Sequence, residues 1–312
     1  MAQPVVNSIE ITRNALKTGP GSLFRFQVIQ RSKGASSPMS THKTVPVILE
    51  YCGGSKTDAL YEALCRSNGC YNIEVLDNAS PRDQSRYVTA RNMHNSFVGG
   101  GLRDCIALAE RKGAEYLFFV CNDIQLIRMP HIEHFESLAA RDESVVLVGA
   151  AITEDSHQAA IYPWMVNKGE RCDRITSHYD PLCCLIRISF IREFGGFPPS
   201  EGGWGYDWEF ASYARFRKRK LIVSDSAVIR HEGDASLSQA NVRKWYEMRR
   251  IYNELYGDYR LLLAWQISGY VPGLRYQFGL RPGPTLHKRR LSDEQLQVVL
   301  ECMQNEITFD RY

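Results

Sequence analysis

Two runs of consecutive apolar residues constrain the fold of this chain most strongly. Residues 45–51 read VPVILEY and residues 116–120 read YLFFV, so almost every position in them is apolar. A strand with one face in water alternates apolar and polar residues, whereas a strand that is buried on both faces does not. Strands of the second kind lie in sheets that helices cover from either side. We therefore expect an α/β protein.

Helical patterns separate the apolar runs. Ser55 and Asp58 resemble a capping box, and Leu60 and Leu64 then lie on one helical face that Gly69 can end. Further strands are predicted at residues 73–76, 145–148, 221–224 and 227–230, and a second helix at residues 102–109. Because strands alternate with helices, we expect parallel pairing of the strands.

The first 43 residues differ from the rest of the chain in charge, because they contain several Lys and Arg residues but only one acid, Glu10. Residues 22–30 alternate apolar and polar side chains, which predicts one half-buried strand. Residues 33–43 have the composition of a flexible link. This extension either packs on the main domain or offers a basic surface to an anionic acceptor or a membrane.

Composition excludes several classes of protein. The chain has 38 basic and 35 acidic residues, and its net charge of +3 is too small for nucleic-acid binding through bulk electrostatics. No run reaches the roughly 18–20 apolar residues of a membrane span, and the first residues lack the pattern of a signal peptide. The nine cysteines form no CxxC pair, which is typical of reduced, mostly buried thiols. We therefore expect a cytoplasmic protein that binds no nucleic acid.

Polar residues follow the predicted strands. Asp77 and Asn78 come after the second strand, and Asn122 and Asp123 come after the third. In open parallel sheets, ligands bind beyond the carboxyl ends of the strands, where an acid can contact a ribose or hold a divalent ion. Asp and Asn also favour turns for local reasons, so a purely structural role stays open for each residue.

A glycine-rich segment precedes the second predicted helix. It runs from Asn95 to Arg103 and reads NSFVGGGLR, with Gly101 as its last glycine. Glycine allows close backbone approach and leaves free N–H groups at the start of a helix. The segment is neither a Walker A loop nor a GxGxxG motif after the first strand, so a dinucleotide-binding fold is disfavoured.

A second group of candidates lies in the later part of the chain. Asp207, in GGWGYDWEF, is either the N-cap of a helix or a general base. Trp204 and Trp208 beside it either stack on a sugar ring or are buried for their apolar surface alone. Trp164 is a weaker candidate of the same kind. His231 follows a predicted strand and is either structural or a ligand.

Seven segments occur in the order found in one family. Between about residues 44 and 255 they read VPVILEY, VLDNASP, NSFVGGGLR, YLFFVCNDI, LIR…FGGF, YDWEF and AVIRHEG. Through them the chain resembles the GT-A-fold glycosyltransferases of family 2, which include rhamnosyl- and galactosyl-transferring members that build bacterial surface polysaccharides. The resemblance implies an α/β, Rossmann-like GT-A fold, in which helices flank a mixed, mostly parallel sheet, with a mainly helical C-terminal extension.

The resemblance also implies how the chain divides. Residues 1–43 are the basic N-terminal extension, residues 44–235 the catalytic domain, and residues 236–312 the helical region. Within the catalytic domain, residues 44–130 form the nucleotide-binding half and residues 131–235 the acceptor half.

Roles for individual residues follow from the same resemblance. It implies a nucleotide-sugar site formed by Tyr51, Asp77, Asn78, Asn95, Gly101, Arg103, Asn122 and Asp123. It implies that Asp123 and His231 hold Mn²⁺ or Mg²⁺ and that Asp207 is the catalytic base of an inverting transfer. Trp204, Trp208 and Glu209 would contact the acceptor or the sugar.

Three positions depart from the pattern of the family. Cys121 stands at the first position of the metal-binding DxD signature, and a thiol is a poor ligand for a hard cation. Tyr206 replaces the acid that usually precedes the base, and Arg103 replaces an Asn that often closes the glycine motif. The proposed base and Asp123 are both retained.

The implied donor is a UDP- or dTDP-linked sugar, and the implied acceptor is a hydroxyl of a glycan or of a lipid-linked molecule. The apolar stretch at residues 261–270 and the basic residues after it predict either peripheral contact with the inner face of a membrane, or a core-packed helix with a basic surface, or a homo-oligomer interface. Two other functions stay open at this point. One is a GT-A-like nucleotidyltransferase, for which residues 52–56 are a faint match, and the other is a catalytically inactive protein that binds glycans or nucleotides.

Overall fold

The computed structural model describes residues 43–156, 159, 162–169, 172–176, 178–196 and 206–232, together with the backbone of residues 26–28. The predicted helical region 236–312, most of the extension 1–43, and Trp204 lie outside the described residues. Within the described part, none of the helices has the length and apolar character needed to cross a membrane.

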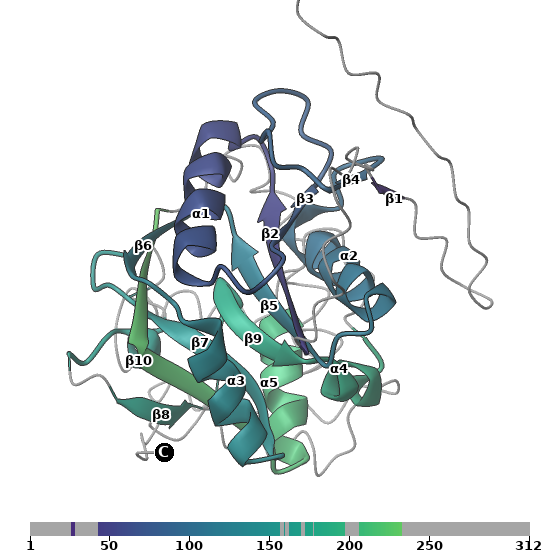
Figure 1. The fold of residues 1–312 in the computed structure, drawn as a ribbon. Coiled ribbons are helices and arrows are strands. Elements are labelled where there is room, and N and C mark those ends of the chain that lie inside the picture. The colour runs from purple at the N-terminus through teal and green to yellow at the C-terminus, as the bar shows by residue number, and fades with distance from the viewer. Residues whose placement is uncertain are drawn as a thin grey trace, which may run out of the picture.

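A mixed sheet forms the centre of the described part (Figure 1). Its strands are β1 (Phe26–Val28), β2 (Thr44–Glu50), β3 (Glu74–Asp77), β4 (Ala90–Asn92), β5 (Tyr116–Cys121), β6 (Ile124–Arg128), β7 (Val145–Ile152), β8 (Asp173–Thr176), β9 (Cys183–Arg187) and β10 (Lys220–His231). They follow the order β1-β4-β3-β2-β5-β9-β7-β10-β6, and β8 also pairs with β10. Strands β4, β3, β2, β5, β7 and β10 all run in one direction, with β9 antiparallel between β5 and β7. The expected mixed, mostly parallel sheet is confirmed.

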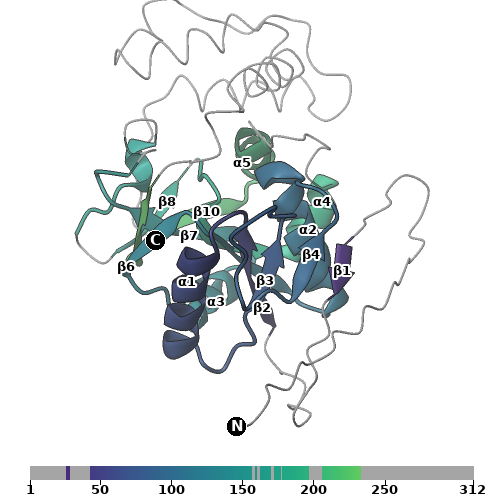
Figure 2. The same cartoon turned by 90° about the horizontal axis from the view of Figure 1, so that it is seen from above.

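Helices cover both faces of this sheet. They are α1 (Gly54–Ser67), α2 (Phe97–Arg111), α3 (Ile132–Arg141), α4 (Ile188–Phe194) and α5 (Tyr206–Phe216), with a short 3₁₀ helix at Pro163–Met165. Helices α1 and α3 lie on one face, and α2, α4 and α5 lie on the other (Figures 1 and 2). This arrangement explains why all six residues of β5 and all eight of β7 are buried.

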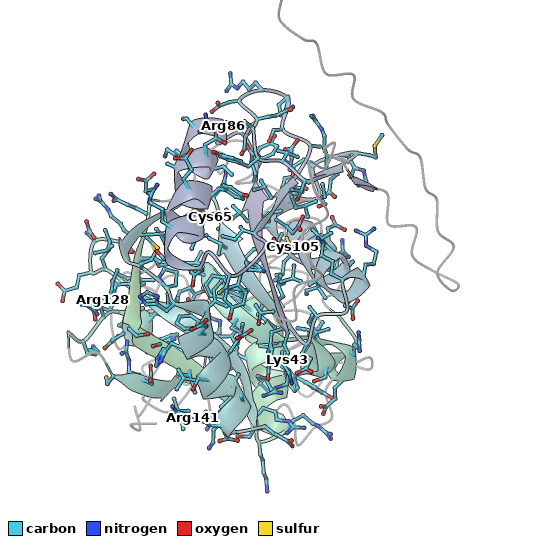
Figure 3. All side chains as sticks on the ribbon, in the orientation of Figure 1. Lys43, Cys65, Arg86, Cys105, Arg128 and Arg141 are labelled. Carbon is cyan, nitrogen blue, oxygen red and sulfur yellow. The ribbon has the colours of Figure 1, made fainter. Side chains whose placement is uncertain are left out.

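The core is built by side chains that alternate between the two faces of the central strands. Phe118 of β5 packs edge-on against Phe135 of α3, with ring centroids 5.7 Å apart. Cys105 of α2 is fully buried on the other face, whereas Arg86 and Arg141 project at the periphery (Figure 3). The β-strand period of two therefore directs neighbouring apolar residues into two separate helix–sheet interfaces.

Gly101 explains how closely α2 lies on the sheet. A Cβ atom at this position would come within 2.5 Å of Cδ2 of Leu49 on β2. Gly99, Gly100 and Gly101 are all buried inside α2, which begins at Phe97. The glycine-rich segment is therefore part of the helix and not a loop ahead of it, and Gly101 has a packing role.

Most predicted elements are confirmed, but their ends differ in places. Residues 221–224 and 227–230 belong to the single strand β10, whose pairing with β7 shifts register between Ser224 and Val228. The capping box at Ser55 and Asp58 is wrong. Helix α1 begins at Gly54 and has no side-chain cap, because Asp58 instead accepts hydrogen bonds from Ser85 and Arg86 in the loop after β3.

We predict that Gly101→Val lowers the free energy of unfolding by about 1–3 kcal/mol, because the new side chain overpacks the contact with Leu49. The measurement is urea denaturation followed by circular dichroism. Ala107→Val adds a branched side chain to the same helix at a half-buried position and is the control. Equal losses in the two variants would contradict the packing role of Gly101.

Candidate functional site

The carboxyl ends of the parallel strands meet at one edge of the sheet. Asp77 is the last residue of β3, Cys121 the last of β5 and His231 the last of β10. Figure 2 views the molecule from above, from the side toward which β2 points in Figure 1. Residues that are far apart in the chain are therefore neighbours at this edge, where open α/β sheets bind ligands.

Unusual backbone conformations gather in the loops at this edge. Cys52 follows β2, Ala79 and Asp83 follow β3, and Phe97 opens α2, and each has a φ between 52° and 61°. A non-glycine residue in the left-handed region costs about 1–3 kcal/mol, and such residues cluster at binding and active sites. The strain supports the choice of this edge as the candidate site.

Asp123 and His231 form the first pair of functional groups. Pairing of β6 with β10 sets Ile124 opposite His231, and Nε2 of His231 then lies 2.9 Å from Oδ2 of Asp123. The main chain adds a bond from the N–H of Glu232 to the carbonyl of Asp123 at 3.1 Å. The sheet thus brings together the two metal ligands predicted from the sequence.

The second carboxylate oxygen of Asp123 has the character expected of a cation ligand. Oδ1 is buried and has no hydrogen-bond partner within the described part of the protein. A buried, unpaired carboxylate oxygen is costly, and a bound cation would remove that cost. A carboxylate oxygen such as Oδ1 of Asp123 is the ligand type that suits Mg²⁺ and Mn²⁺, whereas Nε2 of His231 already contacts Oδ2 of Asp123.

Cys121 does not join this pair. Its side chain is buried, and the thiol contacts the carbonyl of Pro181 at 3.7 Å. Burial also raises the pKa of Cys121 well above its usual value, so the sulfur stays protonated. Among the described residues, no group of three or more His, Cys, Asp and Glu side chains is arranged to hold a metal ion. A cation here would depend on two protein ligands and on oxygens from its substrate.

The predicted nucleotide-binding residues after β3 are closely connected to one another. Asp77 is fully buried, and its carboxylate accepts a bond from the N–H of Ser80 at 2.8 Å and lies 3.3 Å from Nε of Arg91. The amide of Asn78 donates to Oδ1 of Asn95 at 3.0 Å. Asn78 and Asn95 therefore hold the loop before α2 in shape, and these hydrogen bonds lie inside the protein.

The remaining predicted nucleotide-binding residues lie around the start of α1 and in α2. The amide of Asn122 donates to Oγ1 of Thr57 at 3.3 Å and to the carbonyl of Tyr51 at 3.5 Å. A Cβ at residue 53 would lie 2.3 Å from this amide, so Gly53 leaves the room that Asn122 occupies. In α2, Nε of Arg103 is buried and has no hydrogen-bond partner among the described residues.

Asp207 lies in a second, aromatic enclosure. It is the second residue of α5, so it lies inside the first turn, whereas an N-cap would precede the helix. Its side chain is buried, and Oδ2 lies 3.0 Å from Nε2 of His178 and accepts a hydrogen bond from the hydroxyl of Tyr162 at 3.3 Å. The indole of Trp164 donates to the main-chain carbonyl of His178 at 2.9 Å. The side chains of Trp208 and Glu209, the next residues of α5, lie outside the description.

Sequence reasoning missed Tyr162 and His178. Neither residue belongs to a motif or follows a predicted strand, and His178 is 29 residues away from Asp207 in the chain. The only sequence signal was the aromatic pair Tyr162 and Trp164. Only the tertiary structure, in which β8 pairs with β10, brings Tyr162 and His178 into contact with Asp207.

Glu50 was also missed, because it ends the apolar run of β2. It is fully buried opposite Asp77 on the neighbouring strand, and its Oε1 accepts a bond from the N–H of Ser85 at 2.8 Å. Burial, with the charges of Asp77, Asp58 and Asp83, raises the pKa of Glu50 to about 7. Near neutral pH this carboxyl group is therefore only partly ionised.

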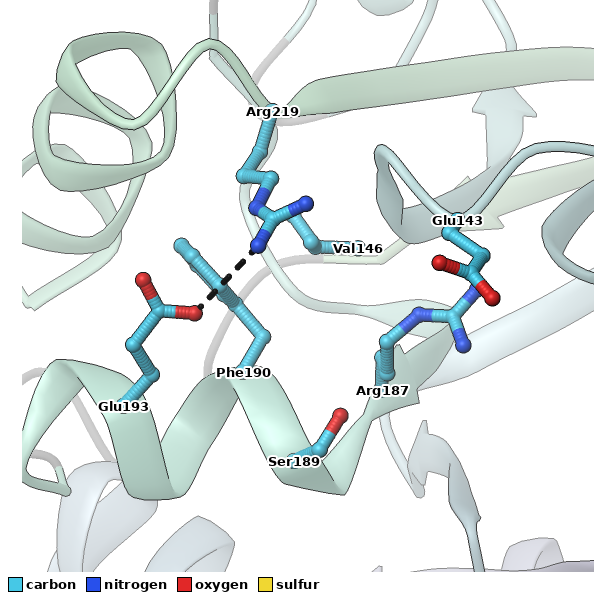
Figure 4. Close-up of a pocket in the computed structure, with 7 residues that line it drawn as sticks. All are labelled: Glu143, Val146, Arg187, Ser189, Phe190, Glu193 and Arg219. Carbon is cyan, nitrogen blue, oxygen red and sulfur yellow. Dashed lines mark ion pairs between the residues drawn. The ribbon is translucent and has the colours of Figure 1, made fainter.

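A cavity of about 280 Å³ lies elsewhere (Figure 4). It is lined by Glu143, Val146, Arg187, Ser189, Phe190, Glu193 and Arg219. The lining comes from the segments where β7 and β10 begin, from the end of β9 and from α4, at the edge opposite to the strand ends described above. Two Glu and two Arg side chains line it, with Arg219 and Glu193 3.5 Å apart, so the charges of the lining largely compensate. We do not assign the candidate function to it.

Comparisons with known proteins give a fold and no family. No protein-family model matches the chain, and no curated protein matches it. Among solved structures, the chain is similar to GalNAc-T7 in complex with UDP, GalNAc and Mn²⁺, with a TM-score of 0.54 and 11% identity. The match covers 83% of this chain and 54% of that one, so the chain spans about half the length of GalNAc-T7.

The fold is the GT-A fold. At 11% identity the likeness to GalNAc-T7 extends to the fold alone. A second structure, A197 from STIV, matches at 16% identity and a TM-score of 0.39 over 61% of this chain and 86% of that one, which is too low to support an argument. The GT-A architecture expected from the sequence is thus confirmed, and the comparisons give no evidence for family 2 in particular.

We predict that Glu50→Gln stabilises the protein at pH 8 and has little effect at pH 5. The pKa of Glu50 is raised in the folded state, so the unfolded state loses this proton first. Stability is therefore lost as pH rises from about 4.5 to about 7. A shift of this size corresponds to about 3–4 kcal/mol.

The measurement is urea denaturation of both proteins between pH 5 and pH 8. Glu143→Gln, which changes an exposed carboxylate of the same type, is the control. If the difference between wild type and Glu50→Gln did not depend on pH, the raised pKa of Glu50 would be wrong.

Proposed function

We propose that this protein is an inverting glycosyltransferase that moves a sugar from a UDP- or dTDP-sugar to a hydroxyl of a glycan or lipid-linked acceptor. One observation carries the proposal. In a GT-A fold, the edge at which the parallel strands end carries the contact between Asp123 and His231, and α5 presents the buried carboxylate of Asp207. The proposed reaction uses a cation to stabilise the charge of the leaving diphosphate and a base to accept the proton of the attacking hydroxyl.

The donor side is built around Asp123 and His231. The unpaired Oδ1 of Asp123 and the imidazole of His231 would hold Mn²⁺ or Mg²⁺. Such an ion, when bound, would stabilise the negative charge that develops on the leaving diphosphate. Lys56, in the first turn of α1, forms an ion pair at 2.5 Å with Glu232, the residue that follows His231, so its charge is balanced by that carboxylate.

Asp207 supplies the base on the acceptor side. Its carboxylate takes the proton of the attacking hydroxyl as the new bond to the anomeric carbon forms and the bond from that carbon to the diphosphate oxygen breaks. A single displacement of this kind inverts the configuration at the anomeric carbon. Trp204, Trp208 and Glu209 are the proposed contacts of the acceptor or the sugar.

The wider setting of the reaction is also a proposal. The cysteine content favours the cytoplasm, and the basic, apolar C-terminal sequence favours contact with a membrane. The resemblance of the seven sequence segments to family 2 supports an enzyme of polysaccharide biosynthesis in that place. In this setting, peripheral membrane contact or a homo-oligomer interface would involve residues 261–290.

We expect Asp207→Asn to keep donor binding and to lower turnover by about 10²–10⁴-fold, because the amide cannot accept the proton. The assay measures release of UDP or dTDP from a panel of their sugars with Mn²⁺, first with water and then with simple glycosides as acceptors. Turnover of the variant at the wild-type rate would exclude Asp207 as the base. If the wild-type protein binds a donor but forms no product, the alternative function, a catalytically inactive protein that binds nucleotides or glycans, is favoured instead.

We expect Asp123→Ala to weaken binding of Mn²⁺ and UDP together by at least about tenfold, since loss of even an outer partner of a metal ligand costs 10–100-fold. Isothermal titration calorimetry, with and without EDTA, measures this change. Cys121→Ser is the matched control and should bind normally, because the thiol of Cys121 contacts Pro181. Equal affinities for wild type and Asp123→Ala would contradict the cation site.

A further inference from the structure

We propose that His178 and Tyr162 are positioning residues that hold the carboxylate of Asp207 ready to accept a proton. The inference rests on the proposed function, because it takes Asp207 as the base. It assigns a role to two side chains that neither the sequence motifs nor the comparisons identify. The observation behind it is that both side chains contact the same oxygen, Oδ2 of Asp207.

The first step concerns the cost of burying the base. The side chain of Asp207 is 9% exposed and that of His178 only 1%. A carboxylate that loses water without gaining hydrogen-bond donors favours its protonated form, in which it cannot act as a base. An imidazole N–H from His178 at 3.0 Å and the hydroxyl of Tyr162 at 3.3 Å replace the lost water.

The second step concerns how His178 is held. Its ring lies over that of Tyr162, with centroids 4.8 Å apart and planes at 31°, and edge-on to Trp164 at 5.9 Å and 89°. Its main-chain carbonyl accepts bonds from the indole of Trp164 and the hydroxyl of Thr176, both at 2.9 Å. Both the ring and the main chain of His178 are thereby fixed.

The third step connects this group to the sheet. Arg174 of β8 forms a buried ion pair with Asp225 of β10. The same guanidinium donates to the carbonyl of Val166 at 2.8 Å and to that of Trp164 at 3.4 Å. The segment that carries Tyr162 and Trp164 is thus tied to β10, the strand that also ends in His231.

These contacts explain why Asp207 needs more than its place in α5. A base must be placed to within about 1 Å of the proton that it accepts, because a displacement of about 1 Å can lower the rate by about 10²-fold. Rigid partners fix the rotamer of the carboxylate at no cost during the reaction. Because His178 and Tyr162 both contact Oδ2, the orientation of the whole carboxylate is set by that one oxygen.

The test compares variants that change one atom group at a time. His178→Phe keeps an aromatic ring against Tyr162 and Trp164 but removes the nitrogen. His178→Gln restores an N–H donor, and Tyr162→Phe removes only the hydroxyl. The matched control is His134→Phe on α3, where the histidine also lies near a carboxylate, with Nε2 3.5 Å from Oδ1 of Asp173.

With the donor that wild type turns over, we expect His178→Phe to lower kcat by about 10²-fold while the Kd of UDP with Mn²⁺ stays within about twofold. His178→Gln should recover about tenfold of this loss, and Tyr162→Phe should lower kcat by about tenfold. His134→Phe should keep the wild-type kcat. A kcat of His178→Phe within threefold of wild type would overturn the inference. So would equal activity of the Phe and Gln variants of His178, since a purely structural role gives no rescue.

Asp207→Asn, measured beside these variants, separates the two proposals. If Asp207→Asn is inactive and His178→Phe is active, only the positioning role fails. If Asp207→Asn is active, the proposed base fails.

A measurement that needs no turnover is ¹⁵N-histidine NMR. The Nε2 proton of His178 should exchange slowly with water in wild type and should exchange faster in Asp207→Ala. An imidazole that exchanges freely in wild type would overturn the positioning role even if no donor is turned over.

Discussion

The candidate site depends on the pairing of β10 with two strands. The C-terminal half of β10 pairs with β6, which brings His231 against Asp123. Its N-terminal half pairs with β8, and there Asp225 holds Arg174 in a buried ion pair. Because both groups of functional residues are anchored on this one strand, which pairs with β6, β7 and β8, main-chain hydrogen bonds as well as loops fix their geometry.

Buried polar groups are concentrated at the strand ends, and each carries a cost that its neighbours offset. Glu50 is only partly ionised near neutral pH, Asp77 lies against Arg91, and Asp207 contacts Tyr162 and His178. Together with the left-handed backbone in three of the nearby loops, these groups make the edge less stable than an apolar one. Such a cost is typical of a region kept for binding and chemistry.

Much of the fold could be predicted because its central strands are buried on both faces, which leaves a pattern in the sequence. Strands β4 and β8 left no apolar run because most of their residues are polar, and β6, β9 and the helix α3 were also missed. The glycine segment was recognised, but its position within α2 was not, because Gly101 is required by Leu49 on another strand. The partners of Asp207 left no pattern at all.

The sequence by itself determined the α/β class, the positions of the main strands along the chain and the identity of Asp123, His231 and Asp207 as candidates. These follow from periodicity and from motifs that are local in the chain. Only the tertiary structure decided that Asp123 meets His231, 108 residues later, that Cys121 turns into the core, and that His178 contacts Asp207. The physical reason is that strand order and register place distant residues together, and no local pattern records which strands become neighbours.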